Sequence, residues 1–228
     1  MSGRSIGAKL SGVHALSTIL FALALPHPAG AQVFGASASH ARPSWWLSVD
    51  AGRSERFSVS DEASSARWTL GESSPMRVAL AYGRLERLIG VAMSHAAIPL
   101  LIVGTSCMGC SARVQALQAL ATYRSTQSLF TTAFTQTLEF GAGVTRWSGL
   151  TGRGGHTLPG IAANHDLTFV AGIGLGLPVG EWLELSVTYD IAAMTHEKQK
   201  NSVFGEVSSS KVSLPTLRAG ARMHLDHQ

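Results

Sequence analysis

The stretch DLTFVAGIGLGLPVGEWLELSVTYDIAA at residues 166–193 contains two successive runs in which apolar side chains alternate with small or polar ones. In residues 167–177 the odd-numbered positions are apolar, and most even-numbered positions hold threonine or glycine. In residues 183–191 the odd-numbered positions are again apolar or aromatic, whereas the even-numbered positions hold Glu, Ser, Thr and Asp. A period of two residues is typical of a β-strand whose two faces meet different environments. With Pro and Gly between the runs, the stretch predicts an antiparallel hairpin.

The N-terminus has the three parts of a secretory signal peptide. Two basic residues precede an apolar run at residues 16–25, and the small residues Ala-Gly-Ala at 29–31 provide a cleavage pattern. The apolar run is too short to serve as a membrane-spanning helix, and two prolines follow it. We therefore expect a signal peptide at residues 1–31, a flexible N-terminal segment at residues 32–44 and one domain at residues 45–225.

The composition after the leader points to a membrane environment without a transmembrane helix. Charged residues make up 14% of the chain and 24 residues are glycine, yet no apolar run approaches the roughly 20 residues that a spanning helix needs. A soluble exported protein usually carries more charge. Two of the four net positive charges lie in the leader, and no basic stripe stands out, so we expect no nucleic-acid partner.

The same alternation recurs along the domain and raises the number of predicted strands to eight. The six further segments are residues 45–53, 76–84, 88–98, 112–124, 129–147 and 212–225. Residues 112–124 also fit a helical face, and a strand is preferred there because the surrounding rhythm requires one. We expect a polar loop at residues 54–74, with a short strand near 67–70, and a tight turn at residues 125–128.

Each predicted strand has at least the roughly 9–11 residues that a tilted strand needs to cross a bilayer, and the connections alternate between short turns and longer loops. Aromatic residues gather near the strand ends, at Trp45, Trp46, Tyr82, Tyr123, Phe130, Trp147, Trp182 and Tyr189. An even strand number, short turns on one side, longer loops on the other and aromatic girdles are typical of outer-membrane β-barrels.

Across residues 45–225 the sequence resembles the small eight-stranded outer-membrane β-barrels of Gram-negative bacteria, the OmpA and OmpX type. The resemblance implies an all-β, antiparallel, up-and-down transmembrane barrel in the bacterial outer membrane. It also implies contact with outer-membrane lipids and with the outer-membrane assembly machinery, and a monomer. One departure is at the C-terminus, where the last predicted strand ends in Leu225 and not in the aromatic residue common in such barrels.

Charged residues occupy the inward positions of the predicted barrel. The inward set comprises Asp50, Arg77, Glu139, Glu184, Asp190, Arg218 and Arg222. Side chains fill the interior of an eight-stranded barrel, and buried charges there should pair. We predict that Arg222 pairs with Glu184, and that Arg218 pairs with Asp190 or Asp50. The favoured interpretation is a structural network that closes the lumen, and the alternative is a gated path for ions or solutes.

The two cysteines, Cys107 and Cys110, form a CxxC motif in a predicted outer loop. A pair of cysteines does not complete a tetrahedral zinc site, and no histidine spacing supports one, so we assign no metal. A thioredoxin-like role would require a βαβ unit. In an oxidising compartment a disulfide between them is expected.

No nucleophile–base pair stands out, so the sequence predicts a non-enzymatic protein without a cofactor. The favoured function is a structural or surface-interaction role in the outer membrane. Two alternatives stay open: a narrow channel or transporter for ions or small solutes, and a soluble exported binding barrel of the lipocalin kind. The Gly-x-Trp start of the lipocalins is missing.

Overall fold

The computed structural model describes residues 42–61, 66–104, 107–129, 134–152, 164–179, 182–195, 200–201, 205–206 and 211–225. The predicted signal peptide and most of the predicted N-terminal segment lie outside these residues, and both stay predictions. The described residues contain β-strands and connections. No helix among them is long and apolar enough to cross a membrane.

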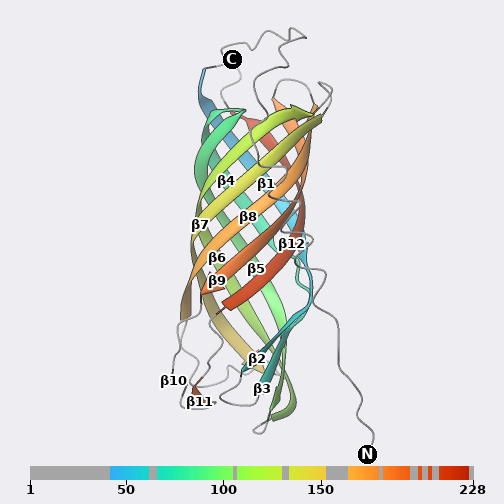
Figure 1. Ribbon diagram of the computed structural model, residues 1–228, viewed down its shortest axis with the longest axis vertical. Coiled ribbons are helices and arrows are strands. Elements are labelled where there is room, and N and C mark those ends of the chain that lie inside the picture. The colour runs from blue at the N-terminus through green and yellow to red at the C-terminus, as the bar shows by residue number, and fades with distance from the viewer. Residues whose placement is uncertain are drawn as a thin grey trace, which may run out of the picture. The chain divides into compact units, whose positions relative to one another are not determined.

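Eight antiparallel strands form a closed ring, which Figure 1 shows as a set of tilted strands. They are β1 (Ser44–Ser54), β4 (Met76–Arg84), β5 (Arg87–Gly104), β6 (Cys107–Leu129), β7 (Phe134–Gly152), β8 (Asn164–Val179), β9 (Leu183–Thr195) and β12 (Lys211–His224). Each strand pairs with its neighbour in this order, and β12 pairs with β1 to close the ring. Because the ring has no free edge, each of these strands has a hydrogen-bonded neighbour on both sides.

The remaining strands lie in the connections at the end of the ring that carries the longer loops, which we call the loop end. The hairpin β2 (Phe57–Asp61) and β3 (Ala66–Leu70) confirms a strand near residues 67–70. β5 is long because it pairs with β4 up to His95 and then with β3 at Leu100–Val103. A second hairpin consists of β10 (Lys200–Asn201) and β11 (Gly205–Glu206).

All eight predicted strands are present, and residues 112–124 lie within β6 as a strand. The predicted turn at residues 125–128 is wrong, because β6 continues through Leu129 and β7 begins at Phe134. The sequence Ser-Thr-Gln-Ser resembles a turn in composition, but it alternates like the rest of β6: Thr126 is buried and Gln127 is exposed. These polar residues pair with the start of β7 at the short-turn end of the ring.

The two faces of the ring have the reverse polarity of a soluble protein. Large apolar side chains are exposed on the outer face, including Val49, Val78, Leu80, Phe140, Leu167, Phe169, Leu175, Leu185, Val187 and Leu217. Leu175, for example, is 54% exposed, whereas the neighbouring Gly174 and Gly176 face the interior. The inward positions of the same strands carry the buried charges.

The interior itself has two different halves. At the loop end it is largely apolar, and one cluster comprises Leu70, Ala96, Ile98, Leu100, Ile102, Val114 and Ala116. A second apolar cluster comprises Leu120, Val170, Ala192 and Met194. Nearer the short turns it is charged: along β9, Glu184 and Asp190 precede Ala192 and Met194. Along β6, the apolar positions come before Arg124.

Candidate functional site

The seven predicted lumen residues all lie inside the ring, each at most 6% exposed. They come from five strands: Asp50 on β1, Arg77 on β4, Glu139 on β7, Glu184 and Asp190 on β9, and Arg218 and Arg222 on β12. Each sits at an inward position because the period of a strand is two residues. The register of the ring then decides which of them meet.

The Glu139 carboxylate is where three arginines converge. Arg77 Nη1 donates to Glu139 Oε1 at 2.5 Å, and Arg124 Nη2 donates to Oε2 at 2.6 Å. Arg124 Nε also reaches Oε2 at 3.0 Å, and Arg218 Nη2 reaches Oε1 at 3.3 Å. Both oxygens of the carboxylate are therefore engaged by charged donors, which are the strong class of hydrogen bond.

Arg218 links Glu139 to two further acids. Its Nε donates to Asp190 Oδ2, and its Nη1 donates to Asp50 Oδ2 at 3.2 Å. Three arginines and three acids thus form one connected group without net charge, which we call the charge cluster. Its members are Asp50, Arg77, Arg124, Glu139, Asp190 and Arg218. A buried network of this kind is tolerable only because its charges are paired and hydrogen-bonded.

Arg124 was absent from the residues predicted for the lumen. It is 7% exposed and belongs to the segment for which strand and helix both remained open. The signal for it was present in the sequence, because Tyr123 points outward and the following residue of a strand must point inward. If residues 112–124 formed a helix, the outward position of Tyr123 would not require Arg124 to point inward.

The second predicted pair, Arg222 with Glu184, is looser. Arg222 Nη2 lies 3.6 Å from Glu184 Oε1, beyond hydrogen-bonding distance, and each residue is 2% exposed. Neither group has a hydrogen bond within the described part of the chain. Gly176 on β8 leaves room for the carboxylate, since a Cβ there would lie 2.2 Å from Glu184 Oε1. The pair is therefore accommodated by a glycine and held mainly by charge.

Cavities of small volume lie on either side of the charge cluster. One of about 60 Å³ is lined by Arg77, Asp190 and Arg218 together with apolar and uncharged polar side chains. Another of about 20 Å³ is lined by Arg77, Arg124 and Glu139 on the side of the short turns. Because members of the cluster line both cavities, the cluster separates them.

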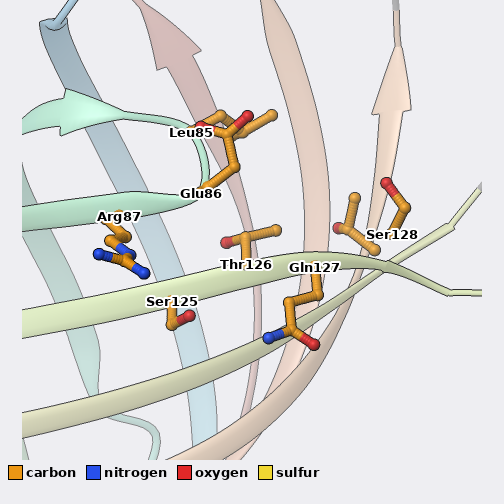
Figure 2. A pocket seen from close by; sticks show the side chains of 8 residues that line it. Leu85, Glu86, Arg87, Ser125, Thr126, Gln127 and Ser128 are labelled. Atoms are coloured by element: carbon orange, nitrogen blue, oxygen red, sulfur yellow. The ribbon is translucent and has the colours of Figure 1, made fainter. Parts of the chain in front are cut away.

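A larger hollow of about 380 Å³ lies at the rim of the short-turn end, as Figure 2 shows. It forms where β6 and β7 run on beyond the turn between β4 and β5. Thr126 N donates to Glu86 O at 3.0 Å at this point. The hollow is lined by Leu85, Glu86, Arg87, Ser125, Thr126, Gln127, Ser128 and Thr135. Because its lining includes one acid, one base and several hydroxyl groups, neither positive nor negative charge predominates there.

The aromatic residues predicted as girdles divide into two groups. Trp45, Tyr82, Tyr123 and Trp182 are between 40% and 47% exposed on the outer face, and Tyr189 is half-exposed there. The rings of Trp45 and Tyr82 lie 5.1 Å apart. Phe130 lies outside the described residues.

The assignment of Trp46 and Trp147 to a girdle is wrong. Trp46 is buried at 8% exposure and stacks on His224 at 4.7 Å. Trp147 packs against both apolar clusters, and its Nε1 donates to Asp166 Oδ2 at 2.7 Å. Both residues share the inward phase of their strands, so they could not lie on the outer face together with Trp45 and Val144.

The prediction of an outer loop around the CxxC motif is also wrong, because Cys107 and Cys110 belong to β6. β5 and β6 pair as far as Gly104 and Cys107, with a register irregularity between Ile102 and Val103. Cys110 is disulfide-bonded, and the chain has one other cysteine. Among the described residues, no group of three or more His, Cys, Asp or Glu side chains is placed to hold a metal ion.

Comparison with known proteins identifies the fold. No family model and no curated protein matches the chain. The crystal structure of Neisserial surface protein A matches with a TM-score of 0.55 and 12% sequence identity. The match covers 80% of this chain and 99% of that protein. The fold is an eight-stranded antiparallel β-barrel.

Proposed function

We propose that this chain is a small outer-membrane β-barrel with a structural or surface-interaction role and a closed lumen. The observation that carries the proposal is the closed ring of eight strands with apolar side chains outside and paired charges inside. In hydrocarbon an unpaired backbone group costs several kcal/mol, so a sheet that spans a bilayer must be closed. An outer face with so many exposed large apolar side chains is suited to lipid.

The interior favours a closed lumen over a channel. Glu139 and its three arginines come from four strands of the ring, so they lie across the interior and not along one wall. Towards the loop end, two apolar clusters fill much of the interior. A barrel closed in this way acts through its outer face and its loops. The neighbour in fold carries the name of a surface protein, which agrees with this role.

A soluble lipocalin-like barrel is not favoured. Such a protein would bury its apolar face around a ligand, and ligand sites usually have volumes of about 300–1,000 Å³. The apolar half of this lumen is filled by side chains, and its cavity measures about 60 Å³. The proposed partners are accordingly outer-membrane lipids and, during insertion, the outer-membrane assembly machinery, with the barrel itself a monomer.

Insertion and closure are tested separately. The purified protein, folded into lipid vesicles, should migrate differently on a gel before and after boiling, and it should float with the vesicles. Loss of both properties would contradict the membrane barrel.

Planar-bilayer recordings test the closed lumen. The wild type should show no sizeable conductance, whereas Arg218→Ala, which removes a link of the charge cluster, should raise leak currents above those of the control Arg53→Ala. A stable open channel in the wild type, unchanged by Arg218→Ala or Arg222→Ala, would contradict the closed lumen and favour a transporter.

A further inference from the structure

The outer face of β5 to β8 is basic and lacks acids. Between Arg87 and His165 the sequence contains one carboxylate, Glu139, and it lies in the charge cluster at 2% exposure. The other acid of these strands, Asp166, is 1% exposed. Within the described parts of β5 to β8, no carboxylate is exposed. Every other acid of the chain lies outside this segment.

Four basic residues are exposed on these strands, towards the loop end. We call them the basic sector: His95, Arg113, Arg146 and His165. Three of them share one row across the sheet. Arg146 on β7 lies directly opposite His165 on β8 and Leu117 on β6, and Leu117 lies opposite His95 on β5. Arg113 lies further along β6 towards the loop end.

On β7 and β8 the basic sector marks the border of the apolar outer face. On β7 the exposed Phe140 and Val144 come before Arg146, and on β8 the exposed Leu167 and Phe169 follow His165. A charged guanidinium in contact with acyl chains is costly, whereas at the level of the headgroups it can be solvated or paired. Arg146 and His165 therefore lie where the apolar belt of these two strands ends and polar headgroups would begin.

Within the described residues, no acid neutralises the two arginines of the sector. Neither Arg113 nor Arg146 has an ion pair within the part of the chain that the structure describes. Arg53, at the loop end of β1, provides a contrast, because it pairs with Glu72 at 2.5 Å.

We propose that the basic sector binds the phosphate headgroup of a lipid in the leaflet at the loop end. The inference rests on the proposed function, since it requires a membrane around the barrel. Guanidinium groups bind phosphate by paired, charge-assisted hydrogen bonds, and the apolar row below Arg146 and His165 contacts the acyl chains of the same lipid.

Native mass spectrometry of the folded protein in a neutral detergent tests the proposal, with bisphosphorylated lipid A and its dephosphorylated form as probes. The wild type should retain the phosphorylated form preferentially. The double variant Arg113→Gln/Arg146→Gln should bind it about 30-fold more weakly, because each arginine near an anionic lipid surface adds to the free energy of binding. The matched control Arg53→Gln removes an exposed arginine that is already paired, and it should leave binding within about twofold.

Equal binding of the two lipid forms by the wild type would overturn the proposal, as would an equal loss in Arg53→Gln and in the double variant. The heat-modifiability gel keeps the two failures apart. Variants that still change mobility on boiling are folded barrels, so a missing phosphate preference in them would contradict the basic sector alone. Failure of the wild type to insert into vesicles would contradict the proposed function.

Discussion

The two halves of the lumen are closed in different ways. At the loop end, Ile98 and its apolar neighbours fill the interior by packing, and most of them sit on adjacent strands, β3, β5 and β6. Nearer the short turns, charges from across the ring fill it by pairing, with Glu139 at the centre. Packing is non-directional and tolerates small changes of shape. A buried charge network is not tolerant, because removal of one member leaves the others unpaired.

The strongest test of this difference is Glu139→Gln. The substitution keeps the volume of the side chain but leaves Arg77, Arg124 and Arg218 without their shared carboxylate. Breaking a buried pair in this way costs about 3–5 kcal/mol. Urea unfolding in lipid vesicles, followed by tryptophan fluorescence, should show a loss of this size. A loss below about 1 kcal/mol, the typical net value of one hydrogen bond, would mean that the network contributes little to the stability of the fold.

The looser pair should respond less. Glu184→Gln removes the charge that faces Arg222 at 3.6 Å, and no hydrogen bond is lost. We expect a loss of about 1–3 kcal/mol, below that of Glu139→Gln, because the buried guanidinium loses its opposite charge but no hydrogen bond. A double-mutant cycle with Arg222→Gln isolates the coupling between the two side chains. A coupling larger than that between Glu139 and Arg124, measured in the same way, would reverse the ranking of the two pairs.

The apolar half should respond least among the buried sites. Ile98 is fully buried, and Ile98→Val removes one methylene from its cluster. Such a change costs about 0.5–1.5 kcal/mol. The same unfolding assay measures it, with Ile89→Val on the exposed outer face of β5 as a control. If Ile98→Val destabilised the barrel as much as Glu139→Gln, the contrast between the two halves would be wrong.

The smallest effect is expected outside the ring, at Glu72. Its hydrogen bond from Arg53, together with the charge of that guanidinium, lowers the pKa of Glu72 below its ordinary value. A carboxyl group whose pKa is lowered on folding stabilises the folded protein at pH values above its ordinary pKa. This contribution to stability is lost as the pH falls through the lowered pKa. Because both side chains are exposed, Glu72→Gln should leave stability unchanged within error at neutral and at acidic pH. A clear loss confined to neutral pH would show that the pair matters.

Much of the inside–outside arrangement could be predicted from local alternation alone. The seven charged positions face the lumen, and Leu175 faces outward, because each assignment needs only the period of a strand. The same rule, applied strictly, would also have placed Arg124, Trp46 and Trp147 inside. At Trp46 and Trp147 the position of an aromatic residue near a strand end competes with the phase of the strand as a signal, and at Arg124 a helical periodicity does so.

The register between the strands of the ring cannot be predicted from the sequence of any one strand. Glu139 is separated from Arg77 by 62 residues and from Arg218 by 79, and these groups meet because β12 closes on β1 with one particular stagger. A strand's own sequence does not contain that stagger, since it depends on the pairing of all eight strands at once. Likewise, residues 125–129 continue β6 because β7 pairs with them, although their composition is that of a turn. The sequence by itself therefore determined which residues face the interior, and the closure of the barrel decided which of them touch.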